Sequence, residues 1–414
     1  MEDTTLNQTP RGGRLHIAIF GRRNAGKSSL INALTNQNIA IVSDVPGTTT
    51  DPVYKSMEIL PIGPVVIIDT AGIDDVGDLG TLRIEKAYGV LAKTDLMLLV
   101  IDPAKGADRY EEDVIKRAKE NNVPVIAVLN KIDLYPQEQM EEMAHRLNLP
   151  VVRVSALTKE GVDLLKLAMI KAAPKDWMST TIVGDLISPG DTIVLVVPID
   201  LAAPKGRLIL PQVQTIRDIL DNDAMAYVVK ERELKAAINN LKNKPRLVVT
   251  DSQAFLKVAA DTPKDVLMTS FSILFARQKG NLMTLVEGVK AIEKLLPGDK
   301  VLVAEACTHH RVEDDIGTVK IPRWLMQHVG GNLDFSWASG IELPSNVGDY
   351  KLVVHCGACM INRKEMLHRI MMARQAHVPI VNYGVLIAYV LGILKRALEP
   401  FPEALQVLSE KEEQ

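Results

Sequence analysis

The run GRRNAGKS at residues 21–28 places the tightest limit on the fold, because it has the spacing GxxxxGK[ST] between an apolar stretch and a helical segment. In such loops glycines let backbone amides surround phosphates, the lysine neutralises the β- and γ-phosphate oxygens, and the final hydroxyl binds Mg2+. The start of the helix adds partial positive charge. The run predicts a nucleoside triphosphate site in an α/β domain. The residues expected there are Gly21, Asn24, Ala25, Gly26, Lys27, Ser28 and Ser29.

Three further motifs follow apolar runs, in the order that a guanine-nucleotide site requires. In DTAG at 69–72, Asp69 offers a carboxylate that holds Mg2+ through water, and Gly72 offers an amide that senses the γ-phosphate. NKID at 130–133 ends in Asp133, whose carboxylate can accept both guanine donors, whereas adenine offers no such pair. We therefore predict GTP rather than ATP. The third motif, SAL at 155–157, lies where the loop that supports the base belongs. The expected base-binding residues are Asn130, Lys131, Asp133, Ser155, Ala156 and Leu157.

The segment PGTTTD at 46–51 is a candidate switch loop between these motifs. A threonine there can bind Mg2+ when the γ-phosphate is present, although the composition also permits a plain turn. We favour the switch, with either Thr48 or Thr49 as the ligand. The residues assigned to hydrolysis are Lys27, Thr48, Thr49, Asp69 and Gly72.

The alternation of apolar runs and helical periods indicates an α/β protein: a P-loop GTPase doubly wound sheet followed by two smaller α/β domains. We expect a disordered N-terminus at 1–13, a GTPase domain at 14–173, a dimerisation domain at 174–262 and a metal-binding domain at 263–414. The first domain should hold a parallel sheet. Its expected strands are 16–20, 65–69, 96–102, 123–130 and 150–155.

The middle domain has strand-like runs at 192–198, 225–229 and 246–250 and no chemical motif. A three-stranded sheet has open edges that a second copy of the chain could cover, although a spacer domain fits equally well. In the last domain a long helical region precedes three expected strands. These strands are 300–306, 350–355 and 379–383, with helices at 363–376 and 386–398.

Composition narrows the class of partners. The formal net charge is −3, and no run of Lys and Arg is interleaved with aromatic residues, which disfavours nucleic-acid binding. The most apolar segment, 378–394, is interrupted by Pro379 and Gly384 and is too short for a membrane helix. The polar N-terminus lacks a secretion signal, so we expect a cytoplasmic protein.

The three cysteines, Cys307, Cys356 and Cys359, lie close together in the sequence. An odd number in a cytoplasmic protein argues for a metal or redox role rather than a disulfide framework. The CxxC pair should lie just before a helix, whose dipole favours thiolates. Side chains alternate along an extended chain, so Glu305 and His309 should face the same way as Cys307.

Three interpretations of this cysteine set remain open on residue chemistry alone. A redox pair would use only Cys356 and Cys359. Zinc could be held by three cysteines and a histidine. A four-iron cluster with three cysteines would leave one iron for another ligand. From the strand geometry, Glu305 is a candidate for that ligand.

The sequence around the loop, with GTTTD and DTAGI, resembles the tRNA-modification-GTPase and Era-like branch of GTPases. In that branch an asparagine at the position of Asn24 can help to hold K+ against the phosphates. Ile73 stands where Ras-like enzymes have a water-orienting glutamine, so slow intrinsic hydrolysis is expected.

CxH followed by HCxxC, downstream of such a GTPase domain, resembles the FeFe-hydrogenase maturation GTPases, the HydF family. The resemblance covers the whole chain. It implies a 4Fe-4S cluster on Cys307, Cys356 and Cys359, with His309 and His355 as candidates for the remaining iron, although His355 would serve equally as a donor that orients a ligand. It also implies a scaffold that passes a transient di-iron subcluster to apo-FeFe-hydrogenase. The implied partners are radical-SAM maturases, the apo-hydrogenase and a second copy of the chain. The rival interpretations are an Era-like RNA-directed GTPase with structural zinc and a cysteine-pair redox protein.

Overall fold

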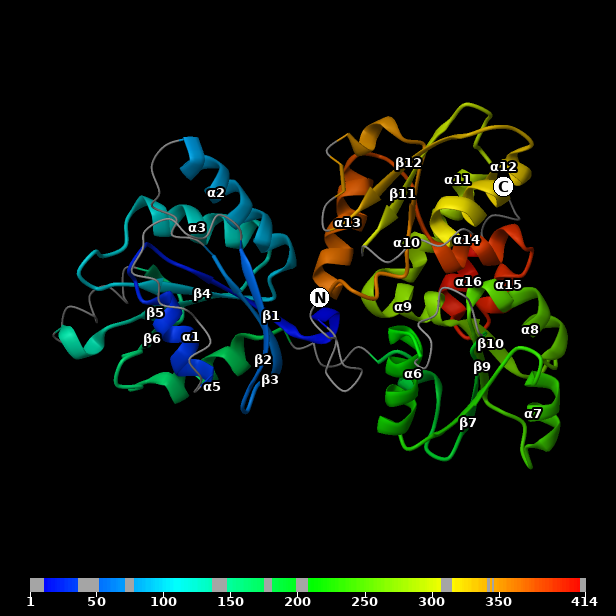
Figure 1. Cartoon of the computed structure of the whole chain (residues 1–414), viewed down its shortest axis with the longest axis horizontal. Helices are drawn as coiled ribbons and strands as arrows, with labels where there is room; N and C mark the ends of the chain where they lie inside the picture. Colours follow the sequence, from blue (N-terminus) through cyan, green and yellow to red (C-terminus); the bar gives the residue numbers. More distant parts are fainter. Residues whose placement is uncertain are drawn as a thin grey trace. The chain divides into compact units, whose positions relative to one another are not determined.

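The computed structural model describes residues 11–35, 52–70, 78–135, 147–174, 181–198, 208–306, 315–340, 343–344 and 346–409. The chain forms two compact units, Thr9–Ser179 and Thr180–Gln414 (Figure 1). The domain limits expected from the sequence stay predictions. None of the helices in the described ranges combines the length and hydropathy that a bilayer crossing needs.

The first unit is built on a six-stranded sheet with the order β2-β3-β1-β4-β5-β6. Every neighbouring pair is parallel except β2 and β3. The strands are β1 (Leu15–Phe20), β2 (Val53–Ile59), β3 (Gly63–Asp69), β4 (Leu96–Ile101), β5 (Val125–Leu129) and β6 (Val151–Arg153). The helices are α1 (Lys27–Thr35), α2 (Asp78–Gly89), α3 (Arg109–Glu120) and α5 (Val162–Ala172).

Helices cover both faces of this sheet, which confirms the doubly wound fold. Leu30 of α1 and Leu165 of α5 pack into the core on one face. Ala87 of α2 and Val114 of α3 pack into the core on the other. The five expected strands are present with slightly different ends. Strand β2 was not predicted from the sequence. It is an edge strand whose residues are mostly exposed or half-buried, so it lacks the apolar run of a buried strand.

The second unit contains two four-stranded parallel sheets that share one hydrophobic core. The first sheet has the order β10-β9-β7-β8. Its strands are β7 (Thr192–Val196), β8 (Met225–Val229), β9 (Leu247–Thr250) and β10 (Leu267–Ser270). The expectation of three strands was wrong. β10 has only four residues and runs directly into a helix, so its apolar residues read as part of the helical pattern.

The second sheet has the order β12-β11-β13-β14. Its strands are β11 (Lys300–Glu305), β12 (Asp334–Ser339), β13 (Leu352–His355) and β14 (Ile380–Asn382). The sequence missed β12, a half-exposed edge strand. The expected helix at 386–398 is interrupted near Gly392, which adopts a φ of 72°. This φ lies in the left-handed region that glycine tolerates best.

The remaining helices of the second unit pack around both sheets. They are α6 (Leu210–Asp221), α7 (Leu234–Asn240), α8 (Phe255–Asp261), α9 (Phe271–Lys279), α10 (Leu282–Glu287), α11 (Val289–Ile292), α12 (Ile321–Val329), α13 (Arg363–Gln375), α14 (Tyr383–Val390), α15 (Leu394–Ala397) and α16 (Pro402–Ser409). Short 3-10 or π-helical turns lie at η1 (Arg11–Gly13), η2 (Val90–Lys93), η3 (Ile132–Leu134), η4 (Gly184–Leu186), η5 (Ser252–Ala254), η6 (Ile316–Lys320) and η7 (Val347–Asp349).

Candidate functional site

The phosphate-binding loop connects β1 to α1, and its backbone requires glycine at both ends. Gly26 has a φ of 93°, and a Cβ there would lie 2.2 Å from Nδ2 of Asn130. A Cβ on Gly21 would lie 2.4 Å from the Val100 carbonyl oxygen. Asn24 also has a positive φ, 62°, which asparagine tolerates better than most residues. The loop therefore approaches β4 and the start of the base-binding motif too closely for side chains at these glycines.

Lys27, the first residue of α1, and Asp69, the last residue of β3, carry opposite charges close to this loop. Nζ of Lys27 donates to the carbonyl oxygens of Gly21 and Arg22 at 2.8 and 3.1 Å, so the ammonium lies across the loop. Asp69 is the last residue of β3 and pairs in register with Ile19 of β1. Burial raises the pKa of Asp69, while the positive charge of Lys27 opposes that rise. This carboxylate near the phosphate-binding lysine suits Mg2+ held through water.

Asn130 connects three of the four sequence motifs. Its Nδ2 donates to the Ala25 carbonyl at 3.0 Å, and its Oδ1 accepts from the Ala156 amide at 3.0 Å. The side chain is buried, so these two hydrogen bonds fix the base-binding loops against the phosphate-binding loop. Asp133 is exposed, as a residue that reads a bound base must be.

The loop that supports the base is held mainly by Ser155. Ser155 is fully buried, and its Oγ accepts from the Thr158 amide at 3.0 Å. Leu157 is 83% exposed. Thr48, Thr49 and Gly72 lie outside the described residues, so their assignments stay predictions.

Two groups of ion pairs near the nucleotide site, one around Arg22 and one at Lys131, were not predicted from the sequence. Arg22 binds Glu111 on α3 through Nε and Nη2 at 2.9 and 2.8 Å, and it also pairs with Asp108. Lys131, with a φ of 63°, pairs with Asp102 at 2.6 Å. The acidic partners lie far away in the sequence and belong to no motif. The only signal available was the position of Asp102 directly after a strand.

The two described cysteines follow β13 at the carboxyl edge of its sheet. Both are free thiols. The Cys356 amide donates to the Ala304 carbonyl at 3.0 Å, and the Ala306 amide donates to Sγ of Cys356 at 3.2 Å. Burial raises the pKa of Cys356 to about 11 and also raises that of Cys359. In the metal-free protein these groups are therefore thiols at neutral pH.

Cys307 and His309 belong to 307–314 and lie outside the described residues. Within the described ranges, no three His, Cys, Asp or Glu side chains gather as a metal site would require. The donor chemistry that is present fits a thiophilic metal. Two free thiols share one CxxC turn, and a backbone amide already points at one sulfur, an arrangement that also tunes iron-sulfur clusters.

His355 is fully buried, and protein groups engage both of its ring nitrogens. Nδ1 lies 2.8 Å from the Cys356 carbonyl, and Nε2 lies 3.0 Å from Nη1 of Arg369. Arg369 can only donate, so Nε2 is the acceptor and Nδ1 carries the proton. Burial and the neighbouring guanidinium lower the pKa of His355 to about 3. This arrangement favours His355 as a donor that holds the cysteine backbone rather than as a ligand.

Glu305 and Tyr383 form a second polar contact near the cysteines. Glu305 is 2% exposed, and its Oε1 accepts from the Tyr383 hydroxyl at 3.4 Å. Burial raises the pKa of Tyr383 well above its usual value, and the charges of Cys356 and Glu305 add to the rise. Glu305 therefore ends β11 with its side chain hydrogen-bonded to Tyr383, close to the cysteine turn.

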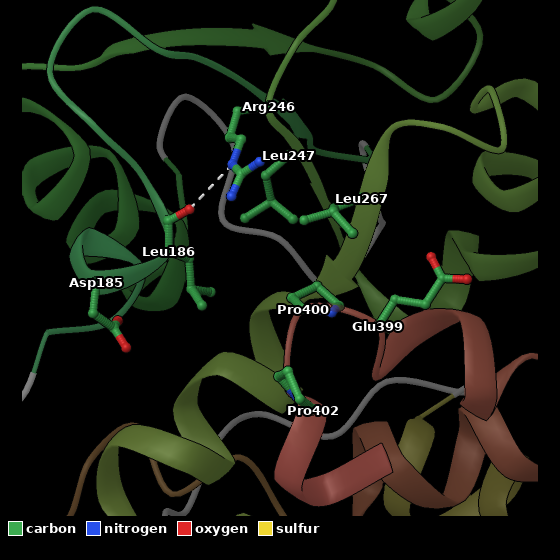
Figure 2. A pocket seen from close by; sticks show the side chains of 8 residues that line it. All are labelled: Asp185, Leu186, Arg246, Leu247, Leu267, Glu399, Pro400 and Pro402. Atoms are coloured by element: carbon green, nitrogen blue, oxygen red, sulfur yellow. Dashed lines mark hydrogen bonds between the residues drawn. The ribbon is translucent and has the colours of Figure 1, made fainter. Parts of the chain in front are cut away.

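A cavity of about 260 Å³ lies elsewhere in the second unit, between the β7–β10 sheet and the segment around Pro400 (Figure 2). Its charged groups already have protein partners: Asp185 pairs with Arg277, Glu399 pairs with Arg396, and Arg246 donates to the Leu186 carbonyl. It contains neither cysteine nor histidine. The lining residues are Asp185, Leu186, Arg246, Leu247, Leu267, Glu399, Pro400 and Pro402.

Comparison with known proteins assigns each part of the chain. Residues 16–131 match the family model of the 50S ribosome-binding GTPase. Residues 182–280 match the hydrogen maturase F dimerization domain, and residues 283–400 match the hydrogen maturase F tetramerization domain.

Individual relatives match the first unit. The tRNA modification GTPase MnmE of Nitrosomonas europaea is 38% identical over 160 residues, which cover 38% of this chain and 35% of that protein. MnmE of Bacillus subtilis is 37% identical over 175 residues, 41% of this chain and 38% of that protein. The chain thus spans little more than a third of the length of these relatives.

Solved structures resemble the chain at lower identity. Era of Aquifex aeolicus bound to GDP.AlF4- is 23% identical with a TM-score of 0.36, covering 59% of this chain and 97% of Era. The G domain of the FeoB iron transporter of T. maritima is 24% identical with a TM-score of 0.29, covering 38% of this chain and 98% of that domain.

The phosphate-binding loop, the base-binding motifs and the matching GTPase model define the class: this chain is a P-loop GTPase that hydrolyses GTP to GDP and phosphate. Most of its second unit consists of the dimerization and tetramerization domains of hydrogen maturase F. The chain therefore belongs to the hydrogen maturase F family and is a hydrogenase maturation GTPase, which confirms the resemblance seen in the sequence.

Proposed function

We propose that this GTPase carries a 4Fe-4S cluster, receives a di-iron precursor beside it and delivers that precursor to apo-FeFe-hydrogenase. The observation that carries this proposal is the 3.2 Å hydrogen bond from the Ala306 amide to Sγ of Cys356. Cys307 directly follows Ala306 in the sequence, and the proposal takes it as the third thiol of the site. A set of three cysteine thiols suits an iron-sulfur cluster with one iron left for another ligand.

The residues around the turn divide the proposed roles. Cys307, Cys356 and Cys359 bind the cluster. His309 and Glu305 are the candidates for the fourth iron, and His355 holds the Cys356 carbonyl instead. When bound, the cluster supplies an iron that can exchange ligands, and the protein's own residues orient the thiolates around it.

GTP acts in this proposal as a signal for partner exchange. Mg2+ binds to Ser28 and Asp69, and Thr48 or Thr49 joins it when the γ-phosphate is present. Loss of that phosphate releases the switch loop, which changes the surface available to radical-SAM maturases and to the apo-hydrogenase. The rival RNA-directed interpretation is not favoured, because hydrogen maturase F models match both domains that follow the GTPase domain.

Anaerobic reconstitution with ferrous iron and sulfide tests the metal assignment. We expect a brown protein with about four irons per chain, and a Cys356→Ser variant with much less iron. Colourless protein that binds zinc would support the structural zinc site instead. A Cys356–Cys359 disulfide that reduces and reforms reversibly would support the redox protein. Lys27→Ala should abolish GTP hydrolysis and leave the iron content unchanged, because Lys27 belongs to the other compact unit.

A further inference from the structure

The carboxyl end of α9 meets the cysteine turn through a buried lysine. Lys279, the last residue of α9, is 4% exposed. Its Nζ donates to the Cys359 carbonyl at 3.2 Å and to the Ile361 carbonyl at 2.7 Å. Lysine is almost never fully buried without a partner, and here two identified acceptors lie on the turn that carries Cys359. The turn is thus fastened to a helix 80 positions earlier in the chain.

Arg363 makes the reciprocal connection from the other side. It is the first residue of α13, which packs against α9. Its Nη1 donates to the carbonyl oxygens of Gln278 and Gly280, the latter at 3.3 Å. Arg363 therefore satisfies carbonyls at the end of α9, while Lys279 satisfies carbonyls just before α13. We call these two sets of contacts the α9–α13 clasp.

The contacts of the clasp are made to backbone carbonyl oxygens on both sides. Both carbonyls bound by Lys279 lie at or after the second cysteine, and Asn362 begins α13 directly afterwards by accepting from the Glu365 amide at 2.9 Å. The turn between Cys356 and α13 is therefore fixed at its carboxyl end.

We propose that Lys279 is a positioning residue that holds the Cys356–Cys359 turn in the geometry that binds the metal. This inference rests on the proposed cluster site. Lys279 donates to two carbonyl oxygens of the turn, so it positions the cysteines through the backbone that carries them. Metal ligands depend on such surrounding groups for their orientation, and replacing them commonly weakens metal binding tenfold or more.

The test compares Lys279→Met with Lys279→Arg and with the matched control Lys294→Met, since Lys294 is exposed on the same unit. The first measurement is amide hydrogen exchange of the peptide 356–362 in the metal-free full chain. We expect exchange at least tenfold faster in Lys279→Met, near wild type in Lys279→Arg, and unchanged in Lys294→Met. Unchanged exchange in Lys279→Met would overturn the proposal.

The second measurement follows iron loss to a chelator after anaerobic reconstitution, together with the EPR spectrum of the reduced protein. Lys279→Met should lose iron at least fivefold faster with an altered spectrum, and Lys279→Arg should restore both.

Faster exchange without faster iron loss would make Lys279 merely structural and refute the positioning role. Wild-type protein that takes up no iron would refute the proposed function itself, while the exchange data still report the clasp. If Lys279→Met fails to fold, Lys279→Gln, which keeps a donor amide, takes its place.

Discussion

Arg22 in the phosphate-binding loop and Glu111 on α3 form a bidentate ion pair, with Nε and Nη2 of Arg22 at 2.9 and 2.8 Å from the two carboxylate oxygens. Glu111 is 1% exposed, and one of its oxygens also accepts from the Asp108 amide at 3.0 Å. These contacts raise the pKa of Arg22 above its usual value, against the effect of burial. The phosphate-binding loop is thereby anchored to the helix behind it.

Glu111→Gln should loosen this anchor. The neutral amide cannot accept both guanidinium hydrogen bonds, and a lost hydrogen bond to a charged group costs about 1.5–3 kcal/mol. We expect that loss in the free energy of unfolding of the GTPase unit and a several-fold weaker affinity for GTP. Denaturant unfolding and nucleotide titration measure the two effects. Asp163→Asn is the control, because Asp163 is 97% exposed and its pair with Lys166 should contribute little. Equal stability of both variants would contradict the anchoring role.

Asn24 gives a prediction for monovalent cations. If its side-chain oxygen helps to hold K+ against the phosphates, GTP should turn over faster in K+ than in Na+, and a stabilisation of about 1.4 kcal/mol would make the ratio tenfold. Asn24→Gly should remove the difference, since glycine keeps the positive φ of 62° without the amide. Asn122→Gly, at another asparagine with positive φ, should leave it intact. Equal rates of GTP hydrolysis by the wild-type protein in K+ and Na+ would contradict a role for K+ at Asn24.

Asp133 is expected to select guanine by accepting two hydrogen bonds from the base. Asp133→Asn replaces one acceptor by a donor, which fits xanthine, where an oxygen stands in place of the exocyclic amine. Each lost bond to the carboxylate costs about 1.5–3 kcal/mol, so GTP affinity should fall roughly a hundredfold or more while xanthosine triphosphate affinity rises. Titration with both nucleotides measures the switch. A variant that keeps its preference for GTP would show that another residue reads the base.

The GTPase class was predictable because its motifs are local and each follows a strand. The strands that the sequence missed, β2, β10 and β12, are short or half-exposed, so they lack the apolar runs that mark buried strands. The groups that hold the sites in place were not predictable either. Arg22 and Glu111 are 89 positions apart, and Lys279 meets Cys359 across 80 positions. Only the folded chain shows these partners.

His355 illustrates a choice that sequence chemistry left open. A histidine before CxxC fits a metal ligand and an orienting donor equally well. The contacts at 3.0 Å with Arg369 and 2.8 Å with the Cys356 carbonyl favour the second role. Both contacts depend on the direction of the His355 side chain at the end of β13, and one also on that of Arg369 in the middle of α13, which a periodic pattern does not encode.

The last prediction concerns β8, which lies at one edge of its sheet. Met225 and Tyr227 are 54% and 41% exposed, and residues two apart share one face of a strand. An exposed apolar edge strand is a ready surface for pairing with another chain. We therefore propose that the dimer forms through this edge, within the region that matches the hydrogen maturase F dimerization domain.

The double variant Met225→Lys, Tyr227→Lys should block that pairing, because lysines along an edge strand disfavour the approach of a second copy. Light scattering after size exclusion should then report a smaller assembly than wild type, with the GTP hydrolysis rate unchanged because the nucleotide site belongs to the other compact unit. Leu256→Lys is the matched control, since Leu256 is 55% exposed on α8 of the same unit. If the double variant kept the wild-type mass, the dimer contact would have to lie away from β8.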